Sequence, residues 1–250
     1  MPYIKITQDM FNNIEYDRAV IGQSEKLTGK MANASECTPT VLIVADKGDL
    51  NAAAYHLARS LQYPFAPEVI VTVLVAESTR PALLERLQAL LKPIPADVSQ
   101  HAERNKILAL IAKHNWETIS IPELGANSPV IVCDVTHEHL GNGYNGVVTL
   151  HTFRTIQESI SLCVKESIKP VNASIWSSNH ASAYEIGLKI PCINIFIDCY
   201  QVSLEPLKTT NATTGTGTCA LVEQNYHYET LKLQNGAKNV VFPIGTAIAN

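Results

Sequence analysis

The sequence has little charge and no excess of either sign. Charged residues make up 17% of its 250 positions, and 19 Lys and Arg stand against 23 Asp and Glu, which gives a net charge of −4. A nucleic-acid backbone is bound through clustered Lys and Arg side chains, and this sequence has no such cluster. We therefore expect no nucleic acid among its partners.

Long hydrophobic runs are also missing, although 46% of the residues are hydrophobic. No segment offers the roughly 18 uninterrupted apolar residues that a membrane-spanning helix needs. The first residues, Met-Pro-Tyr-Ile-Lys-Ile-Thr, lack the basic stretch, the apolar region and the cleavage site of a secretory signal. These absences predict a soluble, cytoplasmic protein without a membrane partner.

The six cysteines form no Cys-x-x-Cys pair, and several lie inside apolar runs. Scattered thiols of this kind are typical of a reducing compartment, so we predict no disulfide. Burial raises the pKa of a thiol and suppresses its reactivity. We therefore predict core positions, and no nucleophilic role, for four cysteines: Cys133, Cys163, Cys192 and Cys199.

Two short motifs suggest ligand binding only weakly. Residues 215–218, Gly-Thr-Gly-Thr, lack the lysine of a phosphate-binding loop and are interpreted as a flexible linker. His137, Glu138 and His139 offer two imidazoles and a carboxylate. In an extended segment both imidazoles would point to one side and still need a third protein ligand, so we predict a solvated turn and no metal site.

What the sequence does contain is a regular alternation of apolar strands and amphipathic helices. Residues 69–75 are apolar on both faces except at Thr72, which is typical of a strand covered on both sides. Asp49, Thr155 and Asn179 are placed to cap helices. Leucines at 83, 84, 87, 90 and 91 are expected to form the buried stripe of another helix. The pattern predicts an α/β fold: a three-layer, mainly parallel sheet with helices on both faces.

The strand-helix-strand segment over residues 172–198, NASIWSSNHASAYEIGLKIPCINIFID, resembles part of the catalytic domain of aldehyde dehydrogenases. Four further segments resemble the same family in the family's own order: 40–61, 71–91, 128–162 and 226–233. The resemblance covers roughly residues 20–232 of this chain and corresponds to the C-terminal half of a full-length member.

The resemblance implies three parts. Residues 1–38 are a lead-in and a possible remnant of the dinucleotide-binding domain, 39–215 form the catalytic-domain-like unit, and 216–250 are a C-terminal tail with an oligomerisation-type strand. The strand expected at residues 226–233 would be an exposed edge unless it joined another chain. We therefore expect a homo-oligomer, or docking onto a full-length aldehyde dehydrogenase relative.

The departures from the family decide the predicted function. Pro67 falls at the position of the nucleophilic cysteine, and a proline has neither a thiol nor a backbone N–H for an oxyanion hole. Asn142 falls at the position of the ribose-binding glutamate, followed by Tyr144, Asn145 and Gly146 in place of Phe-Gly-Pro. We predict a truncated, catalytically inactive relative that needs no cofactor and acts in binding or assembly.

An active enzyme with a displaced nucleophile is the alternative. Cys37 lies near the start of the first strand, and Glu36 beside it is the nearest candidate for the family's general-base glutamate. Under that hypothesis the protein would oxidise aldehydes with NAD or NADP.

Overall fold

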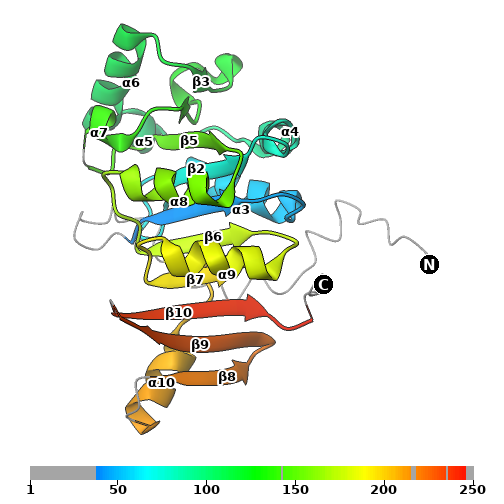
Figure 1. Cartoon of the computed structure of the whole chain (residues 1–250). Coiled ribbons are helices and arrows are strands. Elements are labelled where there is room, and N and C mark those ends of the chain that lie inside the picture. The colour runs from blue at the N-terminus through cyan, green and yellow to red at the C-terminus, as the bar shows by residue number, and fades with distance from the viewer. Residues whose placement is uncertain (1–37, 142, 215–217, 235, 246–250) are drawn as a thin grey trace, which may run out of the picture.

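The computed structural model describes residues 38–141, 143–214, 218–234 and 236–245 (Figure 1). Cys37, Glu36, Asn142 and most of the predicted Gly-Thr-Gly-Thr linker lie outside these residues, as does almost all of the predicted lead-in. Within the described residues, no helix is both long enough and apolar enough to span a bilayer.

One sheet of ten strands runs through the molecule in the order β3-β4-β5-β2-β1-β6-β7-β10-β9-β8 (Figure 1). The strands from β4 to β10 in this order pair in parallel, whereas β3, β9 and β8 pair antiparallel with their neighbours. The strands are β1 (Thr40–Val44), β2 (Ile70–Ala76), β3 (Thr118–Ile119), β4 (Ile131–Cys133), β5 (Val148–Phe153), β6 (Asn172–Trp176), β7 (Asn194–Ile197), β8 (Cys219–Glu223), β9 (Tyr226–Leu233) and β10 (Gly236–Pro243).

Helices cover both faces of the sheet, as the sequence predicts. The helices are α3 (Leu50–Gln62), α4 (Arg80–Leu90), α5 (Ala96–Ser99), α6 (Ala102–His114), the 3-10 helix η1 (Pro122–Asn127), α7 (His137–Leu140), α8 (Ile156–Lys165), α9 (His180–Lys189) and α10 (Glu205–Thr214). Figure 1 shows α8 and α9 in front of the sheet and α3 and α4 behind it. Successive residues of β1 therefore enter different cores: Val41 and Ile43 pack with α8 and α9, and Leu42 and Val44 with α3 and α4.

The predicted helix caps are confirmed. The Asp49 carboxylate accepts hydrogen bonds from the backbone N–H groups of Asn51 and Ala52 at the start of α3. Thr155 caps α8 and Asn179 caps α9 in the same way. The predicted leucine stripe of α4 is only partly right, because Leu83 and Leu87 are buried but Leu90 is 38% exposed.

A row of polar side chains joins the parallel part of the sheet to its antiparallel end. The amide of Asn194 on β7 donates to Asn172 on β6, and the amide of Asn239 on β10 donates to Asn194, both at 2.9 Å. The hydroxyl of Thr230 on β9 then donates to Asn239 at 3.0 Å. Each bond joins residues that are paired across neighbouring strands, so the row holds β10 in register against β7.

The expected exposed edge lies one strand further along the sheet than predicted. The segment 226–233 does form a strand, β9, but this strand pairs with β10 on one side and with β8 on the other. The prediction that β9 is an edge is therefore wrong, because Cys219–Glu223 supply a further strand that local patterns did not indicate. Helix α10, also without a clear sequence period, packs beside β8 and β9.

Candidate functional site

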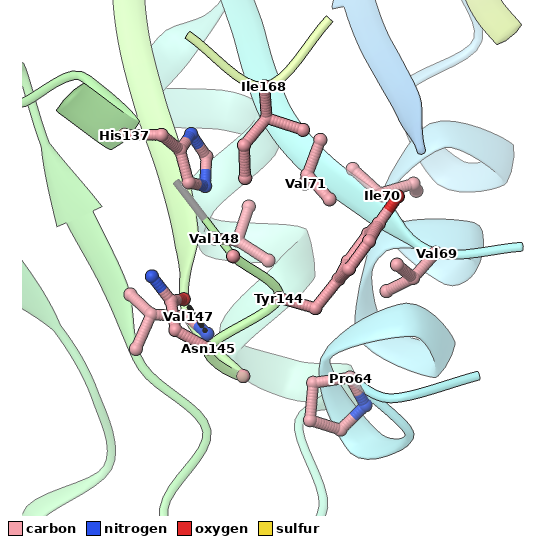
Figure 2. A pocket seen from close by; sticks show the side chains of 12 residues that line it. Pro64, Val69, Ile70, Val71, His137, Tyr144, Asn145, Val147, Val148 and Ile168 are labelled. Carbon is pink, nitrogen blue, oxygen red and sulfur yellow. Dashed lines mark hydrogen bonds between the residues drawn. The ribbon is translucent and has the colours of Figure 1, made fainter. Parts of the chain in front are cut away.

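The two loops that the resemblance singles out lie side by side at the amino ends of β2 and β5. Pro67 comes shortly before β2, and Tyr144–Gly146 come shortly before β5. Because β2 and β5 are parallel neighbours, their first residues meet at one edge of the sheet. Pro64 and Val69 of the first loop therefore lie beside Tyr144 of the second (Figure 2).

Aromatic and backbone contacts hold the loop around Pro67. Gly146 adopts a φ of +74°, and a Cβ atom there would lie 3.0 Å from Cζ of Phe65. The ring of Phe65 also contacts the ring of His101, with centroids 4.3 Å apart. The carbonyl of Pro67 accepts the backbone N–H of Thr38 at 2.7 Å. Of these contacts, the hydrogen bond from Thr38 is the one made by Pro67 itself, and Pro67 is half-buried.

The cavity beside these loops is too small for an organic substrate. Its volume is about 10 Å³, which is room for a single water molecule. Its walls are mostly apolar, and the ring of Tyr144 extends across it toward Ile70 (Figure 2). Ligand sites in enzymes enclose roughly 300 Å³ or more, so this cavity is far smaller than an enzyme's ligand site.

A buried hydrogen-bond network centred on Glu166 adjoins the cavity. Oε2 of Glu166 accepts the backbone N–H of His137 and lies 3.0 Å from Nδ1 of the same residue. Oε1 accepts from the hydroxyl of Thr149 at 3.1 Å and lies 2.9 Å from Nε2 of His151. The side chains of Glu166 and both histidines are at most 5% exposed.

This network corrects the prediction for residues 137–139. His137 is not part of a solvated turn, because it begins α7 and is 1% exposed, although His139 is exposed as expected. Among the described residues, no group of three or more His, Cys, Asp or Glu side chains is arranged to hold a metal ion. The absence of a metal site stays a prediction. Sequence reasoning missed Glu166, which lies just after α8 and has no local motif around it.

The electrostatics of Glu166 favour its charged form. Burial alone would raise the pKa of this carboxyl group, but the hydrogen bonds from His137 and His151 hold the pKa well below its usual range. Nδ1 of His137 faces the carboxylate of Glu166, and the opposite edge of the ring faces the cavity (Figure 2). A carboxylate-oriented imidazole resembles a general base, but the cavity beside it has no room for a substrate.

The four cysteines predicted to lie in the core are confirmed there, each at most 6% exposed. Burial, together with the nearby Glu117 carboxylate, raises the pKa of Cys133 to about 11. Burial also raises the pKa of Cys192 and of Cys199, the latter further raised by Asp198. These three thiols are therefore protonated at neutral pH and are poor nucleophiles.

Comparison with known families gives one match. Residues 35–248 match the family described as "Protein of unknown function (DUF1487)". The chain belongs to this family. Among curated proteins, the DUF1487 chain has no match.

Solved aldehyde dehydrogenases share the fold of this DUF1487 chain. A NAD-dependent benzaldehyde dehydrogenase from Corynebacterium glutamicum is 17% identical, with a TM-score of 0.51 over 65% of this chain and 39% of that chain. Lactaldehyde dehydrogenase from Escherichia coli is 15% identical, with a TM-score of 0.52 over 67% and 40%. A NAD-dependent aldehyde dehydrogenase from Sinorhizobium meliloti is 18% identical, with a TM-score of 0.51 over 67% and 38%.

These likenesses confirm the predicted resemblance at the level of the fold. The matched region covers about two fifths of the length of each aldehyde dehydrogenase, as expected for a partial relative. The α/β architecture with a mostly parallel sheet is likewise confirmed.

Proposed function

We propose that this DUF1487 chain does not oxidise aldehydes and acts in binding and assembly, with the aldehyde dehydrogenase fold as its scaffold. The observation that carries the proposal is the small size of the cavity between Pro64 and Tyr144, at the amino ends of β2 and β5. A proline stands where the resemblance expects the nucleophile, and the adjoining cavity has room for one water molecule.

The chemistry of aldehyde oxidation supports the same proposal. The reaction needs a thiolate to attack the carbonyl carbon, a donor to stabilise the resulting oxyanion, and a cofactor placed to accept a hydride. Pro67 supplies neither a thiol nor an N–H. Cys133 lies on β4 with its pKa raised to about 11, so it is no substitute at neutral pH. We accordingly propose no cofactor.

The hydrogen bonds between Thr38 and Pro67 are the reason to test the alternative function, an active aldehyde oxidoreductase. Thr38 donates two hydrogen bonds to the carbonyl of Pro67, one from its backbone N–H at 2.7 Å and one from its hydroxyl at 3.4 Å. Cys37 directly precedes Thr38 in the chain, and Glu36 precedes Cys37. The alternative function is an aldehyde oxidoreductase that uses Cys37 as nucleophile, Glu36 as general base, and NAD or NADP.

Absorbance in the reduced-nicotinamide band distinguishes the two functions. The purified chain is mixed with NAD or NADP and a panel of short and long aldehydes, and we expect no turnover because Pro67 offers no thiol and the cavity next to its loop holds a single water molecule. Cys37→Ala tests the alternative, and Cys219→Ala, at a half-buried cysteine on β8, is the control. Steady turnover that is lost in Cys37→Ala and kept in Cys219→Ala would establish the alternative and refute the proposal.

A further inference from the structure

The outer edge of β8 is unpaired within the part of the chain that the structure describes, and α10 packs beside this strand. β8 pairs with β9 over Cys219–Glu223 without a register shift, and no strand among the described residues pairs with its other side. Proteins protect exposed edges with lysines, prolines, bulges or very short strands, or by covering them with a helix or loop. Helix α10 and β8 share the cluster of Phe196, Leu207 and Tyr228, to which β8 contributes Cys219 and Leu221. β8 reads Cys-Ala-Leu-Val-Glu, which contains no lysine and no proline, and its regular register shows no bulge.

The side chains of β8 make this edge apolar and hold it in place. Leu221 and Cys219 pack against the cluster formed by Phe196, Leu207, Tyr228 and their neighbours, which fixes β8 on the sheet. Val222 points to the opposite face and is 63% exposed, and Ala220 beside it is exposed as well. Figure 1 shows β8 as the outermost strand of the antiparallel end of the sheet.

We propose that β8 pairs with β8 of a second copy of this chain, antiparallel and about a two-fold axis at Leu221, so that the two sheets become continuous. This inference rests on the assembly role proposed above and names the partner. In this register Leu221 lies opposite its own copy, Ala220 lies opposite Val222, and Cys219 lies opposite Glu223. Main-chain hydrogen bonds along the strand supply the pairing, as in other cases of strand addition.

Charge and volume both suit this register. Glu223 is the charged residue of the strand, and it lies opposite a neutral cysteine and not opposite its own copy. Like charges directly opposite each other would destabilise the pair, and the two-fold arrangement avoids this. The small side chain of Ala220 leaves room for the exposed side chain of Val222 across the interface.

The two-fold arrangement also explains why assembly would stop at a dimer. After β8 is paired, the remaining edge of each sheet is β3, which has only two residues. A very short edge strand is a poor template for further pairing. An isologous contact uses the same surface on both copies and therefore closes the assembly.

Light scattering coupled to size-exclusion chromatography tests the proposal over a range of protein concentrations. We expect a species of twice the 27.3 kDa chain mass. Val222→Lys and Ala220→Glu each place a charge in the apolar contact twice per dimer, so each variant is expected to self-associate at least tenfold more weakly. Val164→Lys makes the same change at a residue that is 51% exposed on α8, and this control is expected to remain dimeric.

Mixing the two edge variants tests the register itself. In a mixed pair the two introduced charges have opposite signs and lie opposite one another, because Ala220 faces Val222 of the other copy. We therefore expect the mixture to recover a dimer that neither variant forms alone. Failure of the mixture to recover it would refute this register, and circular dichroism melts of each variant would show that the chains are folded.

Other results would refute the pairing of β8 with a second copy of the chain. They would not decide whether the chain oxidises aldehydes, which the nicotinamide assay tests. A folded wild-type chain that stays monomeric at every concentration refutes the dimer, as does a dimer that the edge variants leave intact. A monomer that forms a mixed species with a full-length aldehyde dehydrogenase would assign the edge to that partner instead. Turnover in the nicotinamide assay by a chain that does form the β8 dimer would refute only the proposed lack of catalysis.

Discussion

Glu166 carries a buried negative charge that is stabilised by two imidazoles from α7 and β5. Its pKa in the folded chain is held below the ordinary value of 4.5 by hydrogen bonds that outweigh the effect of burial. The unfolded chain therefore binds this proton more readily than the folded chain does in acid. The stabilisation is fully present above the ordinary pKa and is lost progressively as the pH falls toward the depressed pKa.

Glu166→Gln is expected to lower the free energy of unfolding by about 3 kcal/mol at neutral pH, because it removes one member of a buried, hydrogen-bonded charge network. The variant should also lose part of the decrease in stability that the wild-type chain shows between about pH 5 and pH 3. Urea denaturation at several pH values measures both effects. Glu138→Gln, at an exposed position on α7, is the control and should match the wild type. An unchanged acid dependence in Glu166→Gln would contradict the role given to this carboxylate.

At the scale of elements, α9 approaches the sheet closely through a glycine. A Cβ atom at Gly187 would lie 2.7 Å from Cγ2 of Ile195 on β7, a distance that packed side chains do not tolerate without a shift. Gly187→Val is therefore expected to lower the free energy of unfolding by about 1–3 kcal/mol, although valine favours a helix more than glycine does. Thermal or urea unfolding measures the loss.

Gly143→Ala is the matched control for this prediction. A Cβ atom at Gly143 meets no other atom within 4 Å. This substitution should change stability by less than about 0.5 kcal/mol. Equal stability of Gly187→Val and the wild type would show that α9 can move away from β7 at no cost.

At the scale of the whole molecule, the buried cysteines report whether the sheet opens as one unit. Cys133 is on β4, Cys163 on α8, and Cys192 and Cys199 lie before and after β7. We expect these thiols to react with a labelling reagent only when the chain unfolds globally, because each is buried in the native state. Peptide mass spectrometry after pulsed labelling in increasing denaturant measures this. Early labelling of Cys199 alone would instead show that the end of the sheet near β10 opens independently, as a separate C-terminal unit would.

Local features of the fold could be predicted from the sequence, whereas the candidate site could be predicted only in part. The caps at Asp49, Thr155 and Asn179 depend on backbone groups no more than three residues away, so residue type and spacing suffice to identify them. The placement of Pro67 at the expected nucleophile position remains a prediction from resemblance. The packing of Phe65 against Gly146 beside it could not be inferred, because the two residues meet only when β2 and β5 pair.

By itself, the sequence determined the alternation of strands and helices and the burial of β2 on both faces, because hydrophobic period and capping are properties of neighbouring residues. Tertiary structure alone decided three features of the described residues: the network between Glu166 and His137, which lie 29 residues apart, the small cavity beside Pro64 and Tyr144, and the position of the unpaired edge at β8. Each of these depends on which strands become neighbours. That choice minimises the exposed apolar area of the entire sheet and is not encoded in any single segment.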